Sequence, residues 1–504
     1  MFNTITPEQA GISSKAVTKF LRKLEERGEY MHGVLMMRGE NIFSECYWAP
    51  YNRESIHRMY SQSKSFVGIA IGLLEEEGKL NLDDPLADYF PEKLHKPLHP
   101  WLASQTIRQT LLMETTGRNP SWFLDETAVD RTEFYFRTKE VTHPAGTFWQ
   151  YDSPGSQVLC SLVEKLSGKP LLGYLKEKLF NHMGSFQTAK MLKTRNEDTF
   201  GDSAMICTLR DMASVGRLLM QGGVYNGKRL MNEGYIREAT ANLIDNDENG
   251  YFENFHVGYG YHIWQAPRGG FAFVGMGSQM TICLPQYDFL FACTADSQGH
   301  VGSSSEITLI LTALYDFIVD ELCEKPLPAD GEAYGRYLEY TGNLQLKHLP
   351  GRIESSFADK INGVTYICDK NHAGITEFSL YFGENQTGEF RYTNAQGKKV
   401  LPFGLGKNVF GKFPQLGYSQ EHAAVPTTDG SMYDCAASAA WREERKLMLK
   451  VQIIDDYVGN FVAIFCFWEG GCTVRMEKCA EAFLTEYRGI INAKKRFGGK
   501  ENVL

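Results

Sequence analysis

The chain has 504 residues, of which 43% are hydrophobic and 22% charged, and its formal net charge at pH 7 is -9. This composition is typical of a folded protein with a large buried core, and it argues against extended disorder. A mildly acidic chain is a poor partner for nucleic acid or anionic lipid, so neither is expected as a ligand. No run of eighteen apolar residues occurs, so no membrane partner is expected either.

The first residues, MFNTITPEQAG, show neither the basic nor the apolar segment of a secretory signal. The 11 cysteines are scattered singly from Cys46 to Cys479, without a CxxC pair. Such a pattern is typical of reduced thiols, so we expect a cytoplasmic protein. The sequence also has no HExxH motif and no clustered Cys/His ligands, so no metal and no cofactor are expected.

Strands and helices alternate through the first part of the chain. The run MHGVLMMRGENIFSECYW at 31–48 holds two β-rich segments, which predict a hairpin. Strands, a helical block, further strands and a last helix then predict one α/β unit whose sheet pairs the ends of this region, with the helical block packed beside it. The expected helices are Ser65–Glu77, Val158–Leu166, Leu171–Leu179, Leu209–Gln221, Asn232–Ala241 and Glu306–Glu321, and the later strands are Tyr259–Gln265, Phe271–Pro285 and Phe289–Ala295.

The stretch CEKPLPADGEAYG at 323–335 combines prolines with polar residues and predicts a linker at 326–335. Beyond it, short alternating runs are separated by Gly, Asn and Asp turns, as in an antiparallel β-barrel or sandwich. We therefore expect an α/β domain over 1–325 and an all-β domain over 336–504. The predicted strands of the second domain are Val364–Cys368, Glu377–Phe382, Glu389–Thr393, Lys446–Ile453 and Gly459–Trp468.

Several aromatic residues cluster near the end of this second domain, among them Phe461, Phe465, Phe467 and Trp468. They suit either the lining of a barrel cavity or the packing of a core. Core packing is the commoner role of such residues and is favoured here.

Ser61 and Lys64 lie in YSQSKSF, directly at the start of the first predicted helix. Side chains three residues apart share one helix face, so the hydroxyl and the amine can touch. The positive end of the helix dipole favours negative charge on a serine oxygen and disfavours a protonated lysine. Alone, the pattern is more often a capping serine followed by a solvated lysine.

Tyr151 lies in HPAGTFWQYDSPGSQVL, between Gly146 and Pro154, just before another amphipathic helix. Turn residues on both sides indicate a loop that can bring side chains to a site. A tyrosine beside a cationic lysine can donate or accept a proton. The alternative is an aromatic anchor for the loop, which is commoner for a lone tyrosine.

A third motif, FVGMGSQ at 273–279, places Gly275 and Gly277 inside a predicted strand. Glycine weakens a strand unless a ligand or another backbone must approach closely. The motif therefore predicts a strand edge that lines a substrate groove and offers an N–H group to an oxyanion. A β-bulge without a ligand is an equally good interpretation of this motif alone.

The three motifs, in this order, resemble the serine β-lactamase and penicillin-binding-protein superfamily, on the branch of class C β-lactamases, esterases and D-aminopeptidases. The segments GKLNLDDPLADYFPE at 78–92, TIRQTLLMETTG at 106–117 and LRDMASVGRLLMQGG at 209–223 are similar to the same family. The resemblance covers residues 5–325 and implies a β-lactamase-like catalytic domain. The remainder resembles, in pattern only, the lipocalin-like barrel of some relatives.

The resemblance implies that Ser61 attacks a carbonyl and becomes acylated. Lys64 and Tyr151 would move its proton to the leaving group and then activate a water. Ser153, the last residue of the second motif, would position the lysine or the substrate amide. The backbone N–H groups of Ser61 and Met276 would form the oxyanion hole.

One departure from the family pattern concerns Phe273, which stands where a Lys or His normally begins the third motif. A phenyl ring cannot hold a substrate carboxylate, so efficient β-lactamase activity is not expected. We expect Phe273, Gly275 and Gly277 to line a groove for an uncharged group.

The sequence therefore predicts a serine hydrolase that cleaves a small ester, amide or short peptide. The alternative is a penicillin-binding-like module that binds its ligand without turnover. Retention of all three reactive side chains favours the enzyme, and the oligomeric state is not predicted.

Overall fold

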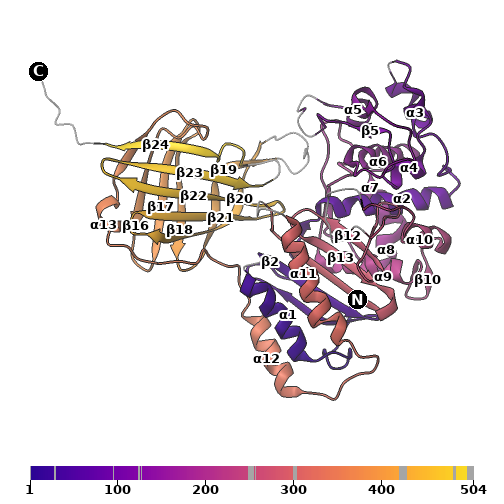
Figure 1. Ribbon diagram of the computed structural model, residues 1–504, viewed down its shortest axis with the longest axis horizontal. Coiled ribbons are helices and arrows are strands. Elements are labelled where there is room, and N and C mark those ends of the chain that lie inside the picture. Colours follow the sequence, from indigo (N-terminus) through magenta and orange to yellow (C-terminus); the bar gives the residue numbers. More distant parts are fainter. Residues whose placement is uncertain are drawn as a thin grey trace, which may run out of the picture. The chain divides into compact units, whose positions relative to one another are not determined.

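The structure is a computed structural model that describes residues 2–27, 30–94, 96–122, 125, 128–247, 255, 257–298, 303–418, 428–480 and 484–496 (Figure 1). The chain divides into two compact units. Among the described residues, unit 1 comprises those within Met1–Ser297 and Val301–Gln345, and unit 2 comprises Gln298 and those within Leu346–Ser419 and Pro426–Leu504. Over the described ranges, no helix has the length and hydropathy needed to cross a bilayer.

A seven-stranded sheet forms the centre of unit 1. The predicted pairing of the two ends of this region is confirmed, because β2 and β14 are antiparallel neighbours with Leu35 opposite Ala292. The predicted hairpin is confirmed too, with Arg38 opposite Asn41. The strand order is β1 (Asn3–Thr4), β3 (Asn41–Tyr47), β2 (Met31–Arg38), β14 (Phe289–Ala295), β13 (Gln279–Leu284), β12 (Phe271–Gly275) and β11 (Trp264–Gln265).

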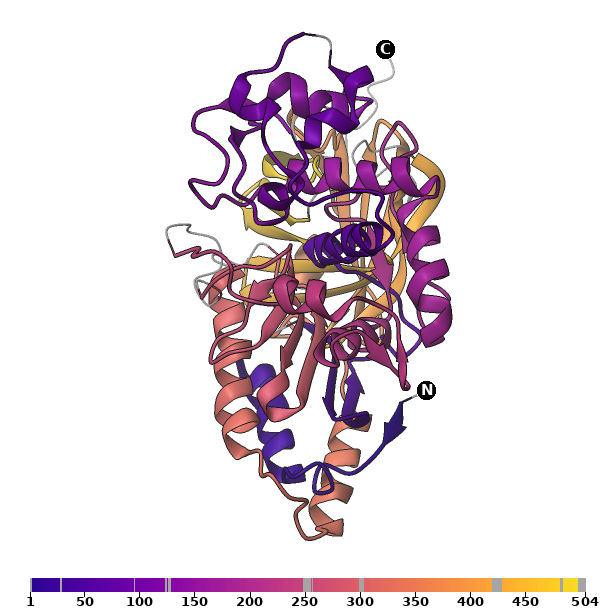
Figure 2. The same cartoon turned by 90° about the vertical axis from the view of Figure 1, so that its right-hand side faces the viewer.

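Helices cover both faces of this sheet. Side chains alternate along β12, so Phe273 joins the apolar cluster on one face and Val274 the cluster on the other. The first cluster includes residues of α2 (Ser63–Glu76), α6 (Ser153–Ser167) and α9 (Leu209–Met220). The second includes α1 (Ser14–Arg27) and α11 (Ser303–Phe317), which lie side by side in Figure 2. The predicted helical block beside the sheet is thereby confirmed.

The other predicted elements of unit 1 are present with shifted ends. The expected strand at 259–265 is paired as a strand only over β11, because His262 adopts a positive φ of 54° that turns the chain. The expected strand at 271–285 is a hairpin of β12 and β13, turned at Gly277 and Ser278 with φ of 79° and 66°. The remaining predicted helices appear as α7 (Leu171–Leu175) continued by a π-turn (Lys176–Phe180), α10 (Glu233–Ala239), and α11 followed by a 3-10 turn (Val319–Glu321).

The boundary between the units lies later than the sequence predicted. Helix α12 (Gly331–Gly342) occupies the second half of the expected linker and belongs to unit 1. Asp330 caps this helix by accepting a hydrogen bond from the Ala333 N–H, and the Tyr340 hydroxyl donates to Glu25 of α1 at 2.5 Å. The polar residues read as a linker are therefore the cap and exposed face of a packed helix.

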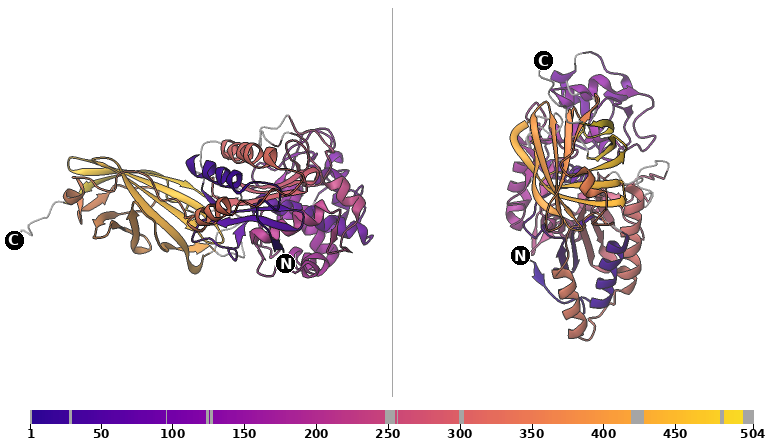
Figure 3. Two further views of the ribbon diagram at one scale, coloured as in Figure 1. Left: turned by 90° about the horizontal axis from the view of Figure 1, so that it is seen from below. Right: turned by 90° about the vertical axis from the view of Figure 1, so that its left-hand side faces the viewer.

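Unit 2 is a closed antiparallel barrel, as predicted (Figure 3). A ten-stranded antiparallel sheet runs in the order β18-β17-β16-β15-β24-β23-β22-β21-β20-β19. An additional parallel pairing of β18 with β20, Leu405 opposite Ala439, closes the nine strands from β18 to β20 into the barrel and leaves β19 outside this ring. The strands are β15 (Thr365–Cys368), β16 (Glu377–Phe382), β17 (Thr387–Asn394), β18 (Gly397–Leu405), β19 (Val409–Tyr418), β20 (Thr428–Glu443), β21 (Lys446–Ile454), β22 (Val458–Trp468), β23 (Gly471–Cys479) and β24 (Gly489–Lys495).

Aromatic rings pack together inside this barrel. Phe465 is completely buried, with its ring centroid 5.6 Å from that of Phe378 and 5.3 Å from that of Phe390. Phe461 and Phe467 are buried as well, whereas Trp468 is exposed. The structure thus supports core packing as the role of the buried rings.

Candidate active site

Ser61 lies in a 3-10 turn (Tyr60–Gln62) directly before α2. Two hydrogen bonds fix this turn, because the Ser63 hydroxyl donates to the Tyr60 carbonyl at 2.6 Å and accepts from the Met205 N–H at 2.9 Å. Tyr60 is held in a left-handed conformation with φ of 49°. Such strain next to the predicted nucleophile indicates a turn whose shape the surroundings impose.

The Lys64 amine donates a hydrogen bond to the Ser61 hydroxyl at 3.0 Å and another to the Asp202 carbonyl at 2.8 Å. Lys64 is almost completely buried. The fully buried Arg58 holds the neighbouring loop, since its guanidinium donates to the Ser203 carbonyl at 3.0 Å and to the Ser203 hydroxyl at 2.9 Å. The structure thus brings the serine and the lysine together, as the helix spacing predicted.

Tyr151 reaches the same place from the loop before α6. Its ring centroid is 5.0 Å from the Lys64 Nζ atom, and its ring stacks on Trp264 at 5.7 Å and 23°. The three predicted catalytic side chains therefore converge. Ser153 is the first residue of α6 and is nearly buried, and its proposed contact with lysine or substrate stays a prediction.

Phe273 does not occupy the position that the sequence predicted for it. Its side chain is 0% exposed and belongs to the apolar cluster under α2 and α9. The inference that this ring faces substrate and selects an uncharged group is wrong, because helices cover both faces of the sheet. The continuous apolar run FAFVG, buried at every position of β12, is the sequence signal of a strand covered on both sides.

Gly275 allows two segments of backbone to approach each other closely. A Cβ at this position would lie 2.2 Å from the Met59 carbonyl oxygen, just before the Ser61 turn. On its outer side β11 pairs only with Phe271 and Ala272, so the strand edge from Phe273 to Gly275 extends past its described neighbour. This edge suits the predicted groove, and the oxyanion role of Met276 stays a prediction.

Gln279 is a residue that sequence reasoning missed. Its side-chain amide donates to the carbonyls of Met276, Gly277 and Ala295 at 3.1, 3.0 and 2.6 Å, and its oxygen accepts from the Ala295 N–H at 3.1 Å. The amide therefore fixes the turn that carries the predicted oxyanion donor. A lone glutamine after two glycines offers no local signal of this role.

His262 connects the helices that carry the site. Its ring nitrogens lie 3.3 Å from the Lys64 carbonyl and 3.3 Å from the Ser156 hydroxyl of α6. Burial, assisted by the charge of Lys64, lowers the pKa of His262 to about 3. The histidine is therefore neutral near pH 7 and acts as a structural link.

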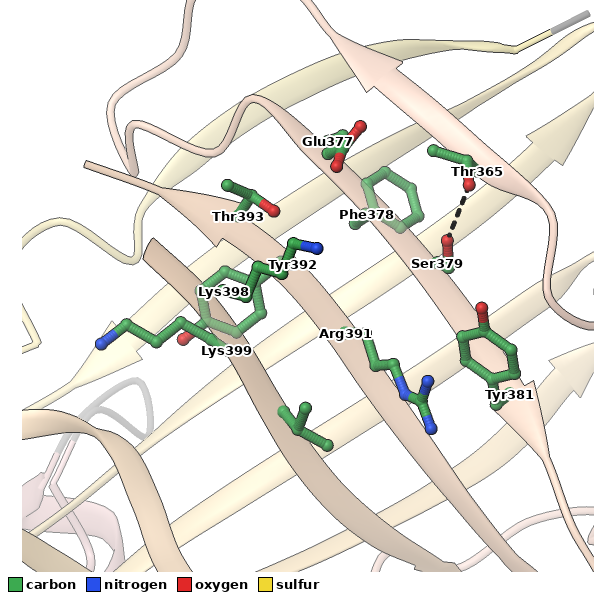
Figure 4. Close-up of a pocket in the computed structure, with 11 residues that line it drawn as sticks. Thr365, Glu377, Phe378, Ser379, Tyr381, Arg391, Tyr392, Thr393, Lys398 and Lys399 are labelled. Carbon is green, nitrogen blue, oxygen red and sulfur yellow. Dashed lines mark hydrogen bonds between the residues drawn. The ribbon is translucent and has the colours of Figure 1, made fainter. Parts of the chain in front are cut away.

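A hollow with a volume of about 300 Å³ lies on unit 2 across β15 to β18 (Figure 4). Its lining includes the short hydroxyl side chains of Thr365, Ser379 and Thr393, next to Arg391 and Lys398. The Ser379 hydroxyl donates to Thr365 at 3.3 Å. Among the described residues no lysine or tyrosine bonds to it, so this serine lacks the surroundings of Ser61. The part of the chain that the structure describes also contains no cluster of three potential metal ligands.

Comparison with known proteins agrees with this geometry. A family model described as Beta-lactamase matches residues 31–313, more than half of the chain. The 6-aminohexanoate-dimer hydrolase of Paenarthrobacter ureafaciens is 26% identical over 255 residues, which cover 47% of this chain and 64% of that protein. The match thus spans less than two thirds of that relative.

Two solved structures share the fold. A putative 6-aminohexanoate-dimer hydrolase from Bacillus anthracis has a TM-score of 0.52 at 18% identity, over 65% of this chain and 89% of that one. A putative beta-lactamase from Bacteroides dorei DSM 17855 has a TM-score of 0.50 at 15% identity, over 60% and 98%. With the family model and the three motifs in order, these findings show that the chain belongs to the beta-lactamase family, within the superfamily of serine β-lactamases and penicillin-binding proteins.

Proposed function

We propose that this protein is a serine hydrolase that forms an acyl-enzyme on Ser61. The observation that carries the proposal is the contact of 3.0 Å between the Lys64 amine and the Ser61 hydroxyl, with the Tyr151 ring 5.0 Å from the same amine. A hydroxyl becomes a nucleophile when a neighbouring base takes its proton, and this arrangement supplies the base. The hydrolases named among its relatives support this class of reaction.

The reaction would proceed in two halves. The Ser61 oxygen attacks the substrate carbonyl carbon while its proton passes to the Lys64 and Tyr151 pair. The carbonyl C–O or C–N bond then breaks, and the leaving group takes that proton. In the second half the same pair removes a proton from water, which attacks the acyl-enzyme, releases the acid and restores the Ser61 hydroxyl. The N–H groups of Ser61 and Met276 would stabilise the oxyanion in both halves.

We propose a small ester, amide or short peptide as the substrate. Trp149, Tyr151 and Trp264 form an aromatic cluster beside Lys64, with the Trp149 and Trp264 ring centroids 5.6 Å apart. A panel of nitrophenyl esters, D-amino-acid amides and a chromogenic cephalosporin ranks the substrate classes directly, and turnover of the cephalosporin alone would contradict an esterase or amidase.

A fluorophosphonate probe tests the nucleophile. The wild type should be labelled, Ser61→Ala should not, and Lys64→Met should react slower by on the order of 10³-fold or more, since it loses the base. Ser104→Ala, at an exposed helix end, is the matched control and should react like the wild type. A folded wild type that takes no label and turns over no substrate would favour the ligand-binding module instead.

A further inference from the structure

A buried ion pair lies directly behind Tyr151. The Lys139 amine is 2.5 Å from the Asp152 Oδ2 atom, and the two side chains are 0% and 4% exposed. The Thr115 hydroxyl donates to the same oxygen at 2.7 Å and accepts from Lys139 at 3.2 Å. The other carboxylate oxygen accepts from the Gly155 N–H at 3.1 Å and so caps α6.

The two chain neighbours of Tyr151 are both bonded to one segment, Met113–Thr116. The Gln150 N–H donates to the Met113 carbonyl at 2.9 Å, while Asp152 is bonded to Thr115. Met113 itself has a positive φ of 60°, which marks a conformation that the surroundings impose. The backbone of Tyr151 is thus held on both sides, and its ring faces the Lys64 amine.

Lys139 compensates a charge that could not otherwise be buried. An ionised carboxylate accepts hydrogen bonds and donates none, so all the groups around Asp152 must be donors, as they are. Burial lowers the pKa of Lys139, and the carboxylate of Asp152 opposes that shift. The Lys139 amine also lies over the Tyr135 ring, 4.6 Å from its centroid. With its side chain fully enclosed, Lys139 touches no reacting atom.

We propose that Lys139 and Asp152 form a positioning pair that holds the Tyr151 phenol beside Lys64. This inference rests on the proposed function and deepens it. Loss of the pair frees the loop between Gln150 and α6, so the phenol moves away from the amine. Proton transfer to the leaving group then slows, whereas the substrate contacts made by the rest of the site persist.

Two substitutions of Asp152 separate the ion pair from helix capping. Asp152→Asn keeps the size of the side chain but removes its charge. Depending on its orientation, the amide then presents to Lys139 and Thr115 either an N–H₂ donor or one carbonyl acceptor. Asp152→Ser keeps a good capping oxygen for Gly155 and removes the carboxylate. In active-site-titrated enzyme, both should lower kcat by at least about tenfold with KM within about twofold, and shift the pH profile of kcat. Lys139→Met should resemble them, and the double variant Lys139→Met/Asp152→Asn should recover part of kcat because no buried charge is left unpaired.

Asp211→Asn is the matched control. Asp211 is also a buried carboxylate at the start of a helix, where it accepts from the Thr208 N–H at 3.0 Å and the Thr208 hydroxyl at 2.8 Å. This variant should lower the melting temperature and leave kcat unchanged. If the Asp152 variants behave in the same way, the pair is only structural and the inference is overturned.

A crystal structure of Asp152→Ser distinguishes failure of this inference from failure of the proposed function. The expected result is a displaced Tyr151 ring that has lost its 5.7 Å stacking on Trp264. An inactive wild type would refute the proposed function, and the ring position would still decide the inference. An unmoved ring overturns the positioning role.

Discussion

The interiors of the two units differ in what they bury. Around Ser61, unit 1 encloses charged side chains, each of them bonded: Lys64, Arg58 and the Lys139–Asp152 pair. The interior of the barrel contains aromatic rings in mutual contact, such as Phe378, Phe390 and Phe465, and Lys450 is the one charged side chain buried among its described residues. The hollow in Figure 4 is lined by polar side chains, among them Ser379, Arg391 and Lys398, and also by Phe378 of this aromatic core.

This difference distinguishes buried residues that serve the proposed reaction from buried residues that stabilise the fold. A buried charge destabilises a fold unless it is paired and fully hydrogen-bonded, so its presence needs a reason. For Lys64 and the Lys139–Asp152 pair, the reason we propose is a site where protons are exchanged between neighbouring groups, whereas Asp211 caps a helix. In the barrel the buried aromatic area contributes to stability directly. The following changes should therefore affect the two units in different ways.

Among single substitutions, the largest change is expected from Phe465→Ala in the barrel. Removing a fully buried ring should lower the stability of unit 2 by about 3–5 kcal/mol, because a cavity replaces the contacts with Phe378 and Phe390. Scanning calorimetry of the full chain measures this, with Phe410→Ala, an exposed ring, as the control. The rate of Ser61 labelling per folded molecule should stay the same. A slower rate would show that the barrel core also affects the site, which would contradict the comparison.

Two glycine-to-alanine changes compare a crowded position near the site with an open position in the same unit. Gly275→Ala should destabilise unit 1 by about 1–3 kcal/mol and slow acylation, since its Cβ would collide with the Met59 carbonyl beside Ser61. Gly335→Ala lies in α12 with no heavy atom within 4 Å of the added Cβ, and should stabilise by about 0.5–1 kcal/mol. Denaturant unfolding and probe labelling measure both effects. Equal effects of the two substitutions would show that the approach of β12 to the turn is not tight.

The last change is a pH dependence, not a substitution, and it concerns buried histidines of unit 1. Burial lowers the pKa of His262 to about 3 and that of His57 to about 4, from an ordinary 6.5. The unfolded chain therefore binds these protons more readily, so the stability of unit 1 is complete above pH 6.5 and is lost as the pH falls toward 4. The slope should be about 1.4 kcal/mol per pH unit for each histidine.

Unfolding free energies measured between pH 7 and pH 4.5 test that slope. His262→Asn should remove its share, whereas His99→Asn, at an exposed helix cap, should not. A wild-type stability that stays constant over this range would contradict the neutral state of the two histidines.

Some features of the site could be predicted because they are local. The contact between Ser61 and Lys64 follows from one helical turn, and the hairpin of β2 and β3 from its turn residues. Lys139 and Gln279 could not be predicted in the same way, since each acts on residues brought close only by folding. The error over Phe273 has a physical cause, because strand alternation assigns a face to a side chain without saying what covers that face.

The sequence by itself determined the family, the helix that begins beside Ser61 and the change from an α/β unit to a barrel, because periodicity and motif order are properties of neighbouring residues. Only the tertiary structure decided that Tyr151 meets Lys64, that α12 belongs to unit 1 and that Phe273 is enclosed. These outcomes depend on contacts between segments far apart in the chain, and the free energy of burying their side chains together selects them.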